Sequence, residues 1–200
     1  MNKLPKIVLS KKPTYLKIAE GLDLFGVFSK IESEFENCFI LESLGEQNSL
    51  SRYSIVGFDP AHIISARGKT LNFDGQKFEV ENPYFTLREI VPQDAISKSY
   101  AGGLIGYLSY ETVNYFEPTL NLKEHELFET FKFGVYLDGL VLDKVTGELF
   151  YFFYENNRLD LVKEAIKSDP KKKKVSVKFL GDTLDKRKHK ENVNYVLEQI

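Results

Sequence analysis

Short apolar runs separated by turn residues dominate the first 155 residues, a pattern typical of β-strands. Residues 71–73 and 78–80 alternate apolar and polar positions on either side of Asp74-Gly75. Because Asp-Gly is a strong signal for a two-residue turn, this segment predicts a β-hairpin. Further strands are predicted by the apolar runs at residues 39–41, 53–58 and 63–64.

A second hairpin is expected near the middle of the chain. The apolar stretch 134–142 is predicted as one strand that returns as residues 149–154 through a turn at Thr146-Gly147. The sequence LFYFFY at 149–154 is apolar on both faces of a strand. That strand should therefore be central in its sheet or covered.

Three segments have the apolar spacing of helices. Asn82 before Pro83 is the pattern of a helix start, because proline is favoured at the first helical position. A second helix is expected over 159–166, ending before Pro170. The last helix is expected to begin near Asp185, with one apolar stripe formed by Val193, Val196, Leu197 and Ile200.

These elements mix without strict strand–helix alternation, and no period of 20 to 50 residues repeats. The expected fold class is α+β, with mostly antiparallel sheets in a sandwich-like arrangement and flanking helices. The composition of the 200 residues, 42% hydrophobic and 14% aromatic, is that of a globular protein and excludes intrinsic disorder. No run of 18 apolar residues exists, so no membrane span is expected.

One cysteine, Cys38, excludes an internal disulfide framework and suits a reducing, cytoplasmic location. We expect it to be a small core residue. The net charge of −2 argues against a protein built mainly to bind nucleic acid. Lysines 171–174 are interpreted as a solvated turn that leads into a strand at 175–179, with a nucleic-acid tail as the less favoured reading.

Few residues have the spacing of a known metal-binding or nucleotide-binding motif. The three histidines, His62, His125 and His189, are far apart and lack partners at ligand spacing, so a zinc site is not expected. The glycines at 102, 103 and 106 have the wrong spacing for a dinucleotide fingerprint. They predict close backbone packing of a strand against its neighbour.

The polar residues around positions 41–52 are the most unusual local feature. Glu42 and Ser43 follow an apolar strand, and Arg52 begins the next one. Such groups can bind the ammonium and carboxylate of a free amino acid through charge-assisted hydrogen bonds. A strand-end salt bridge between Glu42 and Arg52 is the simpler alternative, and spacing alone favours it.

Three segments in order resemble the N-terminal region of the anthranilate synthase component I family of chorismate-utilising enzymes. They are Leu41-Glu42-Ser43 followed by 51–60 (SRYSIVGFDP), then 102–111 (GGLIGYLSYE), and finally 190–200. The last is similar to the helix that opens the family's chorismate-binding half. The resemblance implies residues 1–184 as a regulatory and scaffold region, and 185–200 as the first helix of the catalytic domain.

In that family the complete protein is a lyase that uses Mg²⁺ and ammonia to convert chorismate into anthranilate and pyruvate. A glutamine amidotransferase subunit supplies the ammonia, and L-tryptophan inhibits by feedback. Carried over by position, Leu41, Glu42 and Ser43 line the tryptophan pocket, with Ser51 and Arg52 as weaker candidates. The family's catalytic residues and Mg²⁺ ligands lie outside the present segment, so no catalytic or metal residue is assigned and the chain alone is expected to be inactive.

Three rival readings remain at this point. The nearest is aminodeoxychorismate synthase component I of the folate pathway, which shares most of these motifs. A stand-alone amino-acid-binding regulatory module is the second, and a nucleic-acid adaptor using residues 171–174 is the third. Neither a membrane nor a nucleic acid is expected as a partner of the favoured reading.

Overall fold

The computed structural model describes residues 3–43, 45, 51–97, 99–117, 119–169, 175–182 and 184–200. The chain divides into two compact units, Met1–Pro170 and Lys171–Ile200. Lysines 171–174 lie outside the described residues, so the turn expected there stays a prediction. The domain boundary expected at residue 184 stays a prediction as well.

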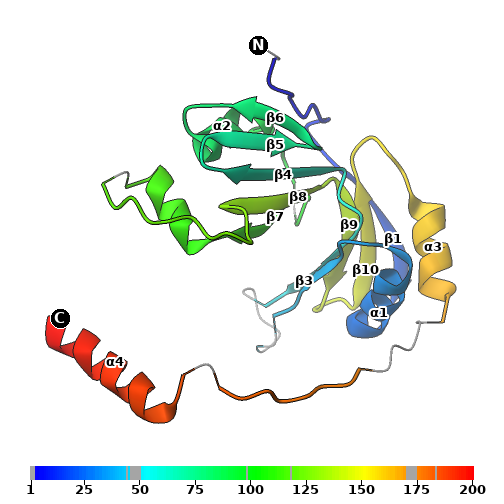
Figure 1. Ribbon diagram of the computed structural model, residues 1–200. Helices are drawn as coiled ribbons and strands as arrows, with labels where there is room; N and C mark the ends of the chain where they lie inside the picture. The colour runs from blue at the N-terminus through cyan, green and yellow to red at the C-terminus, as the bar shows by residue number, and fades with distance from the viewer. Residues whose placement is uncertain are drawn as a thin grey trace. The chain divides into compact units, whose positions relative to one another are not determined.

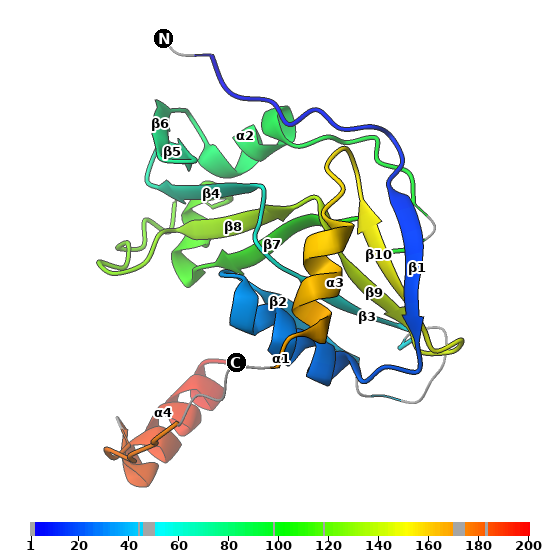
Figure 2. The same cartoon turned by 90° about the vertical axis from the view of Figure 1, so that its right-hand side faces the viewer.

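Sheet A, the first of two five-stranded sheets in the first unit, is antiparallel throughout. Its strand order is β1 (Thr14–Glu20), β10 (Glu148–Phe153), β9 (Asp138–Asp143), β3 (Tyr53–Gly57) and β2 (Phe39–Leu41). Helices α1 (Leu24–Glu34) and α3 (Leu159–Lys167) lie side by side against one face (Figures 1 and 2). The core between sheet and helices includes Val56, Leu140, Leu149 and Tyr151 from the strands, and Val27, Ile31 and Val162 from the helices.

Sheet B is also antiparallel. Its order is β6 (Gln76–Glu79), β5 (Thr70–Phe73), β4 (His62–Arg67), β8 (Phe131–Tyr136) and β7 (Gly103–Leu108). Helix α2 (Pro83–Ile90) packs on one face, and a 3-10 helix, η1 (Tyr110–Tyr115), follows β7. The core of this sheet includes Ile64, Leu71, Phe131, Leu87 and Ile90. The expected α+β class, with antiparallel sheets and flanking helices, is confirmed.

The chain passes between the two sheets twice. Strand β3 of sheet A continues into β4 of sheet B, and β8 of sheet B continues into β9 of sheet A. The prediction of one strand over 134–142 is therefore wrong, because the stretch divides at Leu137 into two strands that pair in different sheets. The prediction for 149–154 is confirmed, since β10 lies between β1 and β9.

Local signals account for several boundaries. Asp74 and Gly75 have φ values of 49° and 85°, which is the left-handed backbone required by the predicted two-residue turn. The Asn82 side chain accepts hydrogen bonds from the backbone N–H groups of Tyr84 and Phe85 at 3.1 and 3.2 Å, so the expected start of α2 is confirmed. Helix α3 is also confirmed within one residue.

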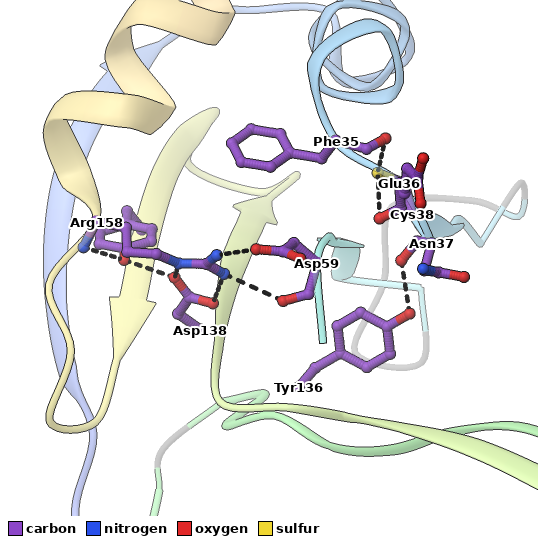
Figure 3. A network of polar contacts seen from close by, with 9 residues as sticks. Phe35, Glu36, Asn37, Cys38, Asp59, Tyr136, Asp138 and Arg158 are labelled. Carbon is purple, nitrogen blue, oxygen red and sulfur yellow. Dashed lines mark hydrogen bonds and ion pairs between the residues drawn. The ribbon is translucent and has the colours of Figure 1, made fainter. Parts of the chain in front are cut away.

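The glycines at 102–106 pack against backbone, as expected. A Cβ at Gly106 would lie 1.9 Å from the carbonyl oxygen of Lys132, and one at Gly102 would lie 2.2 Å from that of Tyr136. Cys38 is half-buried beside the core of sheet A, and its thiol donates to the Phe35 carbonyl at 3.4 Å (Figure 3). Burial raises the pKa of Cys38 to about 11, so the thiol is protonated at neutral pH.

The second unit contains α4 (Lys186–Gln199), which begins after Asp185 as expected. The Asp185 carboxylate caps the helix by accepting from the Lys188 N–H at 2.9 Å. The strand expected at 175–179 is not formed, because alternating side chains make a strand only where another strand pairs with them. Within the described residues of both units, no helix is long and apolar enough to cross a membrane.

Candidate functional site

The predicted ligand residues lie at one end of sheet A. Leu41 is the last residue of β2 and pairs with Ile55 of β3 in an antiparallel register. Glu42 and Ser43 follow it and are exposed. Because the two strands run in opposite directions, residues 51 and 52 at the start of β3 lie at the same end of the sheet.

Lys144, the residue after β9, contacts both of these segments. Its Nζ donates to the backbone carbonyl of Ser43, and its backbone N–H donates to the carbonyl of Arg52 at 2.8 Å. Ser51 is buried, whereas Ser43 is exposed. The structure thus brings the 41–43 and 51–52 segments together, with Ser43 rather than Ser51 open to a ligand from solvent.

Arg52 is paired with Asp143, the last residue of β9. Its Nε lies 3.1 and 3.0 Å from the two carboxylate oxygens, and one Nη lies 2.6 Å from Oδ2. The alternative of a salt bridge between Glu42 and Arg52 is therefore wrong. The Asp143 side chain is only 8% exposed, and a buried carboxylate requires a compensating cation more than exposed Glu42 does.

This pairing fixes the charge at the end of β9. Hydrogen bonds from Arg52 hold the pKa of Asp143 below its usual range, and the same contact raises the pKa of Arg52. Asp143 also accepts from the Val145 N–H at 3.0 Å. Since the Arg52 side chain is 42% exposed, its guanidinium is accessible to a second carboxylate from solvent.

An apolar face of sheet A adjoins these polar groups, and it is exposed at Leu41 but buried at Val141. The registers align Leu41, Ile55, Val141 and Phe150 in one row across β2, β3, β9 and β10. Side chains alternate along a strand, so this row faces away from α1 and α3, which cover Val56, Leu140 and Leu149. Leu41 is 46% exposed. Tyr53 shares the face of Ile55 and lies 5.2 Å below the Arg52 guanidinium.

The arrangement combines an exposed carboxylate, an accessible guanidinium and an apolar wall within one sheet end. Such a combination can hold a small amphipathic molecule with an ammonium, a carboxylate and an apolar side chain. Asp143 and Lys144 were not identified from the sequence. No local signal could have found them, because they lie 91 and 101 residues from Arg52 and Ser43, respectively, and come near only through the pairing of β3 with β9.

Among the residues that the structure describes, no three His, Cys, Asp or Glu side chains come close enough together to hold a metal ion. His62 instead pairs with Asp74, with 2.7 Å between Nδ1 and Oδ2. The tryptophan role of residues 41–43, 51 and 52 stays a prediction.

Comparison with known proteins gives a consistent picture. A family model described as chorismate binding enzyme matches residues 36–200. Anthranilate synthase component 1 of Leptospira biflexa is 45% identical over 98% of this chain and 44% of its own length. The protein of the same name from Methanothermobacter thermautotrophicus is 32% identical over 95% of this chain and 41% of its own.

Among solved structures, anthranilate synthase component I from Streptococcus pneumoniae TIGR4 is similar over 66% of this chain and 30% of that chain, with 20% identity and a TM-score of 0.47. The chain spans less than half the length of the curated relatives named above. Because the family model covers most of its residues, the chain belongs to the family of chorismate-binding enzymes.

Proposed function

We propose that this chain is the N-terminal portion of an anthranilate synthase component 1, which converts chorismate and ammonia into anthranilate and pyruvate in tryptophan biosynthesis. The observation that carries the proposal is the 45% identity over 98% of the chain to a relative of that name. Mg²⁺ would be bound by residues outside this chain, and ammonia would come from a glutamine amidotransferase subunit, component II. A cytoplasmic location suits a protein with one cysteine.

We further propose that L-tryptophan binds at the end of sheet A as a feedback inhibitor. Arg52 would bind the α-carboxylate and Glu42 the ammonium, each through a charge-assisted hydrogen bond. Leu41 and Tyr53 would supply apolar surface for the indole, and Ser43 follows Glu42 at the exposed end of β2. Inhibition would then be a shift of population toward an inactive arrangement, limited by how much better tryptophan binds that arrangement.

Ser43→Phe tests the site. The variant is made in a protein that contains this chain and is as long as the relatives named above. Chorismate, Mg²⁺ and ammonium ions are supplied, and anthranilate is followed by its fluorescence while tryptophan is titrated. We expect the variant to form anthranilate at the parental rate and to lose most of its inhibition by tryptophan, because the larger side chain next to Glu42 would obstruct the proposed ligand position. Ser97→Phe, at an exposed position between α2 and β7, is the matched control and should remain inhibited.

The two parts of the proposal fail separately. Parental protein that forms aminodeoxychorismate, or no product, contradicts the assignment as anthranilate synthase. Anthranilate formation with equal tryptophan inhibition in parent and Ser43→Phe contradicts only the placement of the inhibitor site. The 200-residue chain by itself is expected to form no anthranilate.

A further inference from the structure

The two sheets of the first unit have separate hydrophobic cores. The core of sheet A is completed by α1 and α3, and that of sheet B by α2 and Ile7. Structural units with cores of their own open independently unless contacts between them make opening cooperative. Contacts at the junction between the sheets therefore decide whether the first unit behaves as one body.

The junction is formed by two crossings that lie side by side. Residues 58–61 carry the chain from β3 to β4, and Leu137 carries it from β8 to β9. The same two chain segments pair on both sides of the junction, as β3 with β9 in sheet A, where Val56 pairs with Leu140, and as β4 with β8 in sheet B, where His62 pairs with Val135. A group that held both crossings would fix the two sheets relative to each other.

Arg158, immediately before α3, contacts the first crossing and the residue that directly follows the second (Figure 3). Its Nη1 lies 2.5 Å from Oδ2 of Asp59 in the first crossing. Its Nη2 and Nε lie 2.6 and 2.9 Å from the two carboxylate oxygens of Asp138, which opens β9 directly after the second crossing. One guanidinium thereby joins the first crossing and the start of β9 to the start of α3.

The contact is largely shielded from water. The side chains of Arg158 and Asp138 are 18% and 8% exposed. The Tyr151 hydroxyl donates to Asp138 at 2.8 Å and accepts from the Arg158 N–H at 2.9 Å, and the guanidinium lies 5.1 Å from the Phe58 ring centroid. Removing the guanidinium alone would leave the Asp138 carboxylate buried without a cation, and removing Asp138 alone would leave Arg158 with only the exposed Asp59 as partner.

A second pair of the same chemistry lies at the opposite end of the same two strands. Arg52, directly before β3, is joined to Asp143 at the end of β9, so this pair lies at the far end of these strands from the crossings. We propose that the contacts of Arg158 with Asp59 and Asp138 form a clamp that couples the two sheets, so that β3–β9 and β4–β8 open as one cooperative body. The Arg52–Asp143 pair does not have this role.

Hydrogen exchange of this chain, followed by mass spectrometry in increasing urea, tests the clamp. In the parent, the slowest amides of β4 and β8 should share one opening reaction with those of β3 and β9. In the double variant Arg158→Met/Asp138→Asn, which removes both buried charges together, sheet B should open separately and its slowest amides should exchange about tenfold faster than those of sheet A. Arg52→Met/Asp143→Asn is the matched control and should keep one shared opening.

Asp59→Gly provides a variant that does not disturb the buried charges. Asp59 is half-exposed, and its φ of 44° is readily adopted by glycine, so the variant should fold. This variant removes only the carboxylate in the first crossing. The slowest amides of sheet B should again exchange faster than those of sheet A, but by a smaller factor than in the double variant. Separate openings in the parent, or one shared opening in both clamp variants, would overturn the proposal.

Discussion

At the scale of single residues, the pair Arg52–Asp143 is structural, and in the proposed inhibitor site its guanidinium would also bind the ligand carboxylate. The carboxylate is nearly buried and held by three contacts of 2.6 to 3.1 Å, while the guanidinium remains partly open to solvent. A ligand carboxylate would therefore compete with Asp143 for the same cation. This competition gives the proposed inhibitor a direct means of altering the end of β9.

The pH dependence of unfolding should report this pair. Since Arg52 lowers the pKa of Asp143 in the folded state, the pair stabilises the protein above the unfolded pKa of roughly 4, and this stability is lost as the pH falls through the lower folded pKa. Asp143→Asn should accordingly be less stable than the parent at pH 7, with a difference that shrinks toward pH 2. Urea unfolding followed by circular dichroism measures it, and a difference that stays constant from pH 7 to pH 2 would contradict the role of the charge.

At the scale of elements, the pairing of β7 with β8 depends on glycine at position 106, where no side chain has room. Gly106 faces the carbonyl of Lys132, where an added Cβ would lie at 1.9 Å, far inside the contact distance. Gly106→Ala should force the two strands apart and lower the free energy of unfolding by about 1–3 kcal/mol, the usual cost of overpacking. Gly45→Ala, whose Cβ would meet Ser51 at an ordinary 3.9 Å, is the control for thermal unfolding.

Gly106→Ala with parental stability would show that β7 can shift without cost. If Gly45→Ala lost as much stability as Gly106→Ala, the assay would not separate the cost of close packing from the effect of replacing a glycine. Each variant adds one methyl group, so the difference between their losses of stability reports the close approach of Gly106 to Lys132.

The elements also show which features a sequence can reveal. The Asp74-Gly75 turn and the Asn82 cap are set by neighbouring residues, and both were predictable. Helix α1 was missed, although Asp23 caps it, because Gly26 and exposed Phe25 interrupt the amphipathic pattern of its first turn. The break at Leu137 has no local signal, since the apolar run is continuous and the division is decided by strands far away in sequence.

The same limit applies to the candidate site. The segments 41–43 and 51–52 were brought together as expected, because a short antiparallel pair of strands follows from nearby sequence. The partner of Arg52 was wrong, because Asp143 arrives through the pairing of β3 with β9. Long-range strand pairing, rather than residue chemistry, was the missing information.

At the scale of the whole molecule, the proposed inhibitor site and the proposed clamp share two strands. Arg52 directly precedes β3 and Asp143 ends β9, and the other ends of these two strands lead into the crossings beside Arg158. A change at one end of these strands can reach sheet B only if the junction transmits it. Coupling between sites requires such an element with a defined response to the ligand.

The clamp should therefore affect tryptophan inhibition in a protein of the relatives' length. Arg158→Met/Asp138→Asn should leave the rate of anthranilate formation without tryptophan unchanged, because neither residue belongs to the proposed binding site. The concentration of tryptophan that gives half-inhibition should rise by roughly fivefold or more, the scale of a coupling free energy of about 1 kcal/mol. Inhibition curves at several chorismate concentrations measure this shift, with Glu164→Gln on the exposed side of α3 as the control. Parental inhibition in the double variant would mean that the site acts through contacts other than β3, β9 and the sheet junction.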